Sequence, residues 1–131
     1  MSTQRVDLVV IGWKCPYSDA KKYEQMDGNQ SKVDFYEDFV SDKDLDYYNI
    51  EKNDMNKGYC FFDGCGGEFI VWGIPLAAKC DDSDVMDFEI KAWSKEELTA
   101  KKMLAKQFRD TLPECIRPEG KPQLIIFTQY H

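Results

Sequence analysis

The stretch VDLVVIGWKCPYS, residues 6–18, carries the clearest structural signal in the chain. Its first half, Val6 to Gly12, holds a continuous run of leucine, valine and isoleucine, which is typical of a strand buried on both faces. We therefore place this strand in the middle of a sheet. Pro16 suits the first turn of a helix, because its fixed φ is helical and its missing N–H would be unpaired there. The pattern predicts a helix over Tyr17 to Met26, ended by Asp27-Gly28.

A second strand is predicted over Val33 to Val40. Apolar and aromatic residues alternate there with acidic ones, which indicates a strand with one solvent-exposed face. A strand-helix-strand unit of this length usually closes by a right-handed crossover. The sequence therefore predicts an α/β fold with a central mixed sheet flanked by helices.

The remaining sequence indicates short strands and one long helix. The helix, Lys95 to Leu112, opens with a capping box in which Ser94 and Glu97 satisfy each other's backbone N–H groups. A short helix is expected within Ser41 to Lys57, and a closing strand over Gln123 to Gln129. Further strands are predicted over Tyr59–Phe62, Glu68–Trp72, Leu76–Lys79 and Val85–Trp93, the first three separated by the turn-forming Asp63-Gly64, Gly66-Gly67 and Gly73-Ile74-Pro75.

Composition limits the size and the partners of the protein. A chain of 131 residues with 43% hydrophobic content is expected to form one domain, residues 1–131. The net charge of -7 argues against nucleic acids and anionic membranes, because phosphate binding needs concentrated Lys and Arg. The apolar run from Leu8 to Ile11 is too short to cross a bilayer, and the N-terminus does not have the order of a signal peptide. We therefore expect a cytoplasmic protein.

The five cysteines are odd in number and irregularly spaced, so free thiols in a reducing compartment are the simplest interpretation. Cys60 and Cys65, with Cys80 and Cys115, could supply four thiolates to zinc, but structural zinc sites normally show two close pairs. Core cysteines or a Cys60–Cys65 disulfide fit better. The single histidine, His131, ends the chain, which argues against hydrolases that need a buried imidazole.

Cys15 is the predicted working residue, at the turn between the first strand and the first helix. The unpaired N–H groups and the positive dipole end of a helix stabilise a thiolate, and Lys14 adds a cation, so the Cys15 pKa should fall. Trp13 beside it is expected to be exposed and would suit a rim where a protein partner docks. The alternative is a buried, inert cysteine at the end of a strand.

The sequence Trp13-Lys14-Cys15-Pro16-Tyr17-Ser18 resembles the active-site loop of glutaredoxins, members of the thioredoxin-like superfamily, in the form with Ser in place of the second cysteine. The resemblance covers about the first 35 to 40 residues. It implies a thioredoxin-like domain with an enlarged middle region and an extra C-terminal strand. It also implies that Cys15 attacks a glutathione mixed disulfide or a protein disulfide, and that reduced glutathione completes the cycle. Some such proteins instead hold a two-iron two-sulfur cluster between two subunits.

The family also has a proline, usually cis, beside the nucleophile, and a Cys-Asp-Asp stretch that holds the glutamyl group of glutathione. Here Pro75 or Pro122 is the implied proline, and Cys80-Asp81-Asp82 is the implied binding stretch. A solvated acidic turn is the alternative for that stretch. Gly12 stands where many glutaredoxins have a lysine that pairs with glutathione.

Three functional interpretations follow. The first is a monothiol glutaredoxin-like oxidoreductase that uses Cys15. The second is a thioredoxin-like binding or adaptor module without catalysis, which the single in-loop thiol and the missing lysine favour. The third is an unrelated α+β fold in which the Cys-Pro-Tyr-Ser match is chance; trans peptide bonds at both Pro75 and Pro122 would support it.

Overall fold

The computed structural model describes residues 5–25, 35–39, 53–62, 69–81 and 93–130. Within them the chain forms four strands, three α-helices and one short 3-10 helix. In chain order these are β1 (Arg5–Pro16), α1 (Ser18–Gln25), α2 (Phe35–Phe39), β2 (Tyr59–Phe62), β3 (Phe69–Asp81), α3 (Lys95–Asp110), η3 (Glu114–Ile116) and β4 (Gln123–Tyr130).

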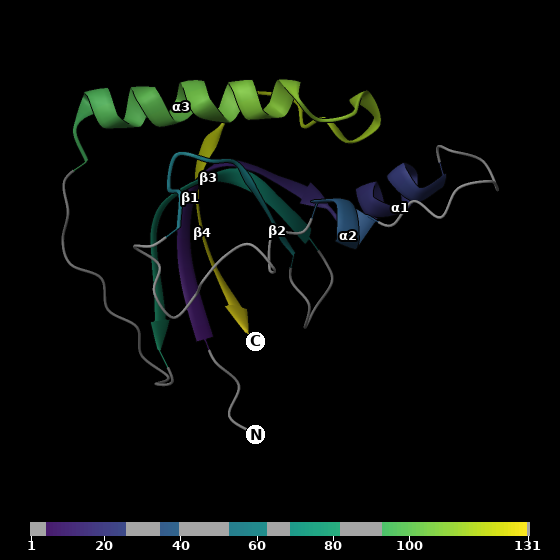
Figure 1. The fold of residues 1–131 in the computed structure, drawn as a ribbon, viewed down its shortest axis with the longest axis horizontal. Coiled ribbons are helices and arrows are strands. Elements are labelled where there is room, and N and C mark those ends of the chain that lie inside the picture. The colour runs from purple at the N-terminus through teal and green to yellow at the C-terminus, as the bar shows by residue number, and fades with distance from the viewer. Residues whose placement is uncertain (1–4, 26–34, 40–52, 63–68, 82–92, 131) are drawn as a thin grey trace.

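The four strands form one sheet in the order β2-β3-β1-β4, and every pairing is antiparallel. β1 pairs with β3 on one side and β4 on the other, which confirms that the first strand lies in the middle of the sheet. Figure 1 shows α3 crossing the top of the sheet, with α1 and α2 together near the end of β1. The protein is thus an α/β fold, but the predicted mixed sheet is wrong for the described strands, which all pair antiparallel.

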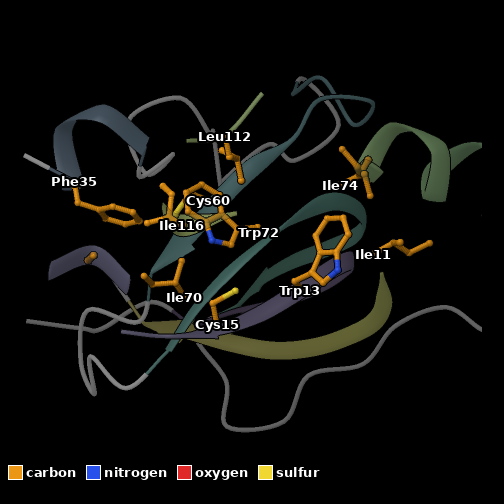
Figure 2. Packing of buried hydrophobic residues seen from close by; sticks show 12 residues of the cluster. Ile11, Trp13, Cys15, Phe35, Cys60, Ile70, Trp72, Ile74, Leu112 and Ile116 are labelled. Carbon is orange, nitrogen blue, oxygen red and sulfur yellow. The ribbon is translucent and has the colours of Figure 1, made fainter. Parts of the chain in front are cut away.

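Side chains on the two faces of the sheet form two apolar clusters, because successive residues of a strand point to opposite faces. The larger cluster lies on the face that carries the helices (Figure 2), and its sheet residues include Ile11, Trp13, Cys15 and Trp72. The helices contribute Ala20, Phe35, Ala105 and Ile116 to this cluster, and Leu112 joins it from the link between α3 and η3. The smaller cluster, on the opposite face, consists of Leu8, Val10, Tyr59, Phe61 and Val71, with Phe69, Ile125 and Phe127 packed against it.

The long C-terminal helix is confirmed. Ser94 caps α3, and its side-chain oxygen accepts a hydrogen bond of 3.1 Å from the backbone N–H of Glu97. This is the contact expected of the capping residue in the predicted box. The closing strand is also confirmed and reaches Tyr130 as β4.

The strand predicted over Val33 to Val40 is wrong, since residues 35–39 form the helix α2. Phe35 and Phe39, four residues apart, fall on one face of this turn of helix. Their rings lie 5.7 and 5.6 Å from the ring of Trp72, so tertiary packing favours the helix over the alternating strand pattern. The predicted strand-helix-strand unit does not form as described.

The turn predicted at Gly73-Ile74-Pro75 is also wrong, because β3 runs without interruption from Phe69 to Asp81. β2 pairs with β3 only as far as Gly73, so Pro75 lies where β1 is the neighbouring strand on one side and no described strand lies on the other. The register shifts by one residue beside Pro75, opposite Val9 and Val10. A strand tolerates proline at such a bulge, where a missing N–H breaks no regular ladder bond.

Several predicted segments lie outside the described residues: both turns within 63–67, most of the strand over Val85–Trp93, and most of the segment Ser41–Lys57, whose last five residues form no helix. Among the described residues, no helix combines the length and the apolar character that a membrane crossing requires.

Candidate functional site

Cys15 lies inside a strand and not at a turn before a helix. β1 continues to Pro16, with Cys15 opposite Ile70 and Pro16 opposite Phe69 of β3. The helix α1 begins only at Ser18. Cys15 is 7% exposed and belongs to the larger apolar cluster. Because β3 extends the ladder past Gly12, the strand carries Cys15 into the core, and the prediction of a thiol at a helix terminus is wrong.

The electrostatic surroundings of Cys15 also differ from the prediction. Burial, and to a smaller extent the nearby carboxylate of Asp19, together raise the pKa of the Cys15 thiol to about 11. Lys14 does not offset this effect, because its ammonium lies 5.2 Å from the centre of the Phe69 ring, and residue 14 points to the face of the sheet opposite residue 15. The thiol is therefore protonated at neutral pH.

Alkylation should report this protonation directly. With a pKa of about 11, only about one Cys15 thiol in a thousand is ionised at pH 8. We expect iodoacetamide to modify Cys15 at least about tenfold more slowly than the half-buried Cys115, and the Cys15 rate to keep rising beyond pH 10. Peptide mass mapping after timed quenching measures both rates. A Cys15 that reacts fastest at pH 6 would contradict the buried position.

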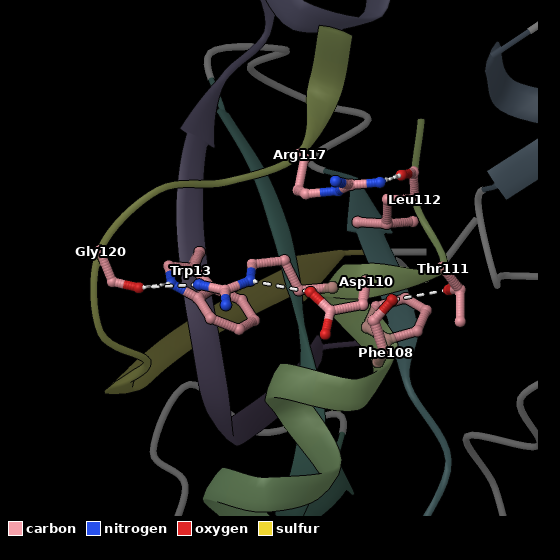
Figure 3. A network of polar contacts seen from close by, with 8 residues as sticks. Trp13, Phe108, Asp110, Thr111, Leu112, Arg117 and Gly120 are labelled. Atoms are coloured by element: carbon pink, nitrogen blue, oxygen red, sulfur yellow. Dashed lines mark hydrogen bonds and ion pairs between the residues drawn. The ribbon is translucent and has the colours of Figure 1, made fainter. Parts of the chain in front are cut away.

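Trp13 was predicted to be exposed at a docking rim, but this is wrong, since Trp13 is only 5% exposed. Its indole Nε1 donates a hydrogen bond of 3.1 Å to the carbonyl of Gly120 (Figure 3). The guanidinium of Arg109 lies 5.4 Å from the centre of the Trp13 ring and donates to the same carbonyl. Trp13 and Arg109 therefore fix the loop before β4 against the end of β1.

The other residues of the implied active-site loop remain near Cys15. Pro16 is exposed at the end of β1, and Ser18 is exposed at the first position of α1. Tyr17 between them is half-buried and packs against the larger cluster. Pro16, Tyr17 and Ser18 therefore follow Cys15 directly, but the helix begins too late to place its N-terminus at the sulfur.

The implied glutathione-binding stretch lies far from Cys15. Cys80 and Asp81 lie opposite Val6 and Arg5, at the other end of β1. Nine residues of strand separate Val6 from Cys15, which is about 30 Å at about 3.3 Å per residue. Asp82 lies outside the described residues. Cys80 and Asp81 therefore do not share a site with Cys15.

Neither candidate proline faces the Cys15 sulfur in a cis turn. Pro75 lies opposite Val10, five residues along β1 from Cys15. No peptide bond among the described residues is cis, those before Pro75 and Pro122 included. The described residues also contain no group of three or more His, Cys, Asp or Glu side chains that could hold a metal ion.

A groove that the sequence does not predict lies beside Cys15, where β1 extends past β4. β4 pairs with β1 only from Arg5 to Gly12, so the segment from Trp13 to Pro16 has no described strand on that side. This space forms a groove of about 550 Å³, which we call the β1–β4 groove. Its walls are residues 12–15 of β1, residues 118–121 of the loop and residues 123–126 of β4.

Two apolar side chains of β4 are unusually open to solvent. Leu124 and Ile126 are 55% and 71% exposed, and both line the groove. They lie opposite Ile11 and Val9, which places them on the helix-bearing face of the sheet, beyond the part that α3 covers. A second hollow of about 410 Å³ adjoins Leu124 and is lined by Ile11, Trp93, Leu98, Lys102, Pro122 and Gln123.

The apolar run from Leu124 to Phe127 does not predict this exposure, because such a run is typical of a buried strand. Position at the edge of the sheet decides which of its side chains are covered.

No family model, curated protein or solved structure matches this chain.

Proposed function

We propose that this protein is a binding module that takes up an extended segment of another protein along β4 and the β1–β4 groove. The observation that carries the proposal is the pair Leu124 and Ile126, which are more than half exposed on a strand at the edge of the sheet. Exposed apolar side chains at a sheet edge support recognition by strand addition, in which backbone hydrogen bonds give affinity and side-chain pockets give specificity.

The composition of β4 supports this role. Monomeric proteins protect their edge strands with charged residues, prolines or bulges, because an open edge pairs readily with another chain. β4, with the sequence QLIIFTQY, has no charged residue, no proline and no glycine. Its eight residues therefore carry none of the side chains that protect an edge.

The groove wall is held in place before any partner arrives. The hydrogen bond from Trp13 to Gly120 and the contacts of Arg109 with both residues fix the loop that leads into β4. Arg117 extends this support, because its guanidinium donates two hydrogen bonds, of 3.2 and 2.7 Å, to the carbonyl of Leu112 (Figure 3). A preorganised wall lowers the ordering cost of binding.

A monothiol oxidoreductase of thioredoxin-like fold is the second candidate. In that role Cys15 would attack a glutathione mixed disulfide or help to hold an iron-sulfur cluster. The observation in its favour is that Cys15 lines the β1–β4 groove, where a disulfide could approach. The raised pKa of the thiol and the distance of Cys80 and Asp81 weigh against it, so we place it second.

Ile126→Asp should weaken binding strongly without unfolding the protein. We would measure fluorescence anisotropy with a labelled eight-residue peptide of alternating Thr and Val. Burying an isoleucine contributes about 1.5–3 kcal/mol, so we expect Ile126→Asp to weaken the Kd by at least about tenfold. Because the native Ile126 is already 71% exposed, its replacement leaves the core intact.

Met103→Asp is the matched control, since Met103 is 57% exposed on α3 and lines neither the groove nor the hollow beside Leu124. It should bind like the wild type. A peptide with proline at every second position, which lacks the N–H groups needed for strand pairing, should not bind. Equal losses in the two aspartate variants, or equal binding of the proline peptide, would refute strand addition.

A further inference from the structure

The charge at the β1–β4 groove is opposite in sign to the net charge of the whole chain. The protein has a net charge of -7. The side chains that line the groove and the hollow beside Leu124 nevertheless include three lysines, Lys14, Lys102 and Lys121, against one acid, Glu119. An acidic protein therefore presents a locally basic rim beside two exposed apolar residues, with Lys102 on the face of Leu124 and Ile126 and Lys14 on the opposite face.

The three lysines are available to a partner. Each is exposed, and none forms an ion pair with a carboxylate in the part of the chain that the structure describes. Lys14 rests over the Phe69 ring with its ammonium 5.2 Å from the ring centre, which leaves its charge unneutralised. Arg109 at the groove wall adds a fourth cation, although Asp110 lies 3.7 Å from it.

From this charge pattern we infer that the segment bound at the groove is acidic as well as apolar. The inference rests on the proposed function and names the chemistry of its partner. In an added strand, alternate side chains would lie on the helix-bearing face beside Leu124 and Ile126, which favours aliphatic residues there. Asp or Glu residues at the intervening positions would point to the opposite face, where Lys14 lies over Phe69. The partner is therefore a protein segment in which acidic and aliphatic residues alternate.

Two other occupants fit less well. Nucleic acid would meet three lysines at the groove but a strongly acidic protein around them, and it would leave Leu124 and Ile126 without an apolar partner. A second copy of this chain would bring a net charge of -7 against another of -7. Both occupants can be distinguished from an acidic segment by experiment.

Three labelled ten-residue peptides test the inference on the full chain by fluorescence anisotropy: Asp alternating with Val, Thr alternating with Val, and Lys alternating with Val. Exposed ion pairs are individually weak, so we expect those with Lys14 and Lys121 together to make the acidic peptide bind about fivefold more tightly than the neutral one at low salt. The basic peptide should bind most weakly. Raising the salt concentration should reduce the difference in Kd between the acidic and the neutral peptide, because dissolved ions screen these charges.

Charge reversal at the rim should remove this preference. In Lys14→Glu/Lys121→Glu the acidic peptide should bind no better than the neutral one. The matched control is Lys21→Glu/Lys22→Glu, which alters the net charge equally at two exposed positions of α1 outside the groove and should keep the preference.

The other possible results distinguish a failure of the inference from a failure of the proposed function. If all three peptides bind equally and Ile126→Asp weakens binding strongly, the proposed function stands and the acidic partner is wrong. If no peptide binds, the proposed function fails and the inference fails with it. A labelled single-stranded oligonucleotide that binds more tightly than the acidic peptide overturns the inference in favour of nucleic acid. A dimer in sedimentation analysis that the peptides dissociate overturns it in favour of a second copy.

Discussion

Replacing Gly12 with alanine is expected to leave the protein largely unfolded. Gly12 lies opposite Gly73 in the β1–β3 ladder, where the two backbones approach closely. An alanine Cβ would overlap the carbonyl oxygen of Trp72 and lie 2.6 Å from the Cα of Gly73. These are backbone atoms, so no side-chain rotation relieves the clash, and β1 and β3 would have to separate. We expect a loss of about 3 kcal/mol or more, a large part of the stability of an ordinary domain.

Gly120→Ala is the control for this variant. A Cβ at Gly120 meets no atom within 4 Å, but its φ of 87° lies in the left-handed region, so the substitution should cost only about 1 kcal/mol. Urea denaturation followed by circular dichroism measures both changes. If Gly12→Ala and Gly120→Ala unfold at the same urea concentration, the close approach of β1 and β3 is not what requires glycine at position 12.

The elements that could be predicted from the sequence are those with a strong local signal. The apolar run at the N-terminus identifies β1, and Ser94 with Glu97 identifies the start of α3, because both signals act within a few residues. β2 and β4 are likewise short apolar runs bounded by turn-forming or polar residues. In each case the local preference and the final packing agree, which is typical of elements that sequence patterns identify.

The errors arise where contacts distant in sequence override the local pattern. Residues 35–39 alternate like a strand but form α2, because Phe35 and Phe39 pack against Trp72. Gly73 and Pro75 suggest a turn, but Gly73 is needed for the close approach to β1. Its own Cβ would lie 2.7 Å from the carbonyl oxygen of Ile11. A turn glycine and a close-packing glycine look alike in one sequence.

The candidate site was only partly predictable for the same reason. The sequence draws attention to the segment from Trp13 to Cys15, and this segment lines the groove. The burial of Cys15 and Trp13 depends on where β3 and the loop before β4 end, and neither position can be read from residues 13–18. The exposure of Leu124 and Ile126 depends on strand order, which places β4 at the edge of the described sheet.

Trp72→Ala should be the most destabilising substitution of a core side chain. Trp72 is fully buried on β3, and its ring lies 5.7, 5.6 and 6.1 Å from the rings of Phe35, Phe39 and Phe108. It therefore joins α2 and α3 to the centre of the sheet. Removing a buried tryptophan typically costs about 3–5 kcal/mol, because the cavity closes only in part. A lowered urea midpoint, measured by circular dichroism, would confirm this role.

Trp72→Phe should lower the free energy of unfolding far less than Trp72→Ala does, because it also removes an unpaired hydrogen-bond donor. The indole Nε1 of Trp72 is buried without a hydrogen-bond partner among the described residues, and an unpaired buried donor costs about 1–3 kcal/mol. Phenylalanine removes that donor and keeps most of the ring contacts, so the two changes partly offset each other. At Trp13 the same substitution removes a donor that is paired with the carbonyl of Gly120. Trp13→Phe should therefore destabilise the protein more than Trp72→Phe does, and the reverse order would show that the Trp72 N–H has a partner in solution.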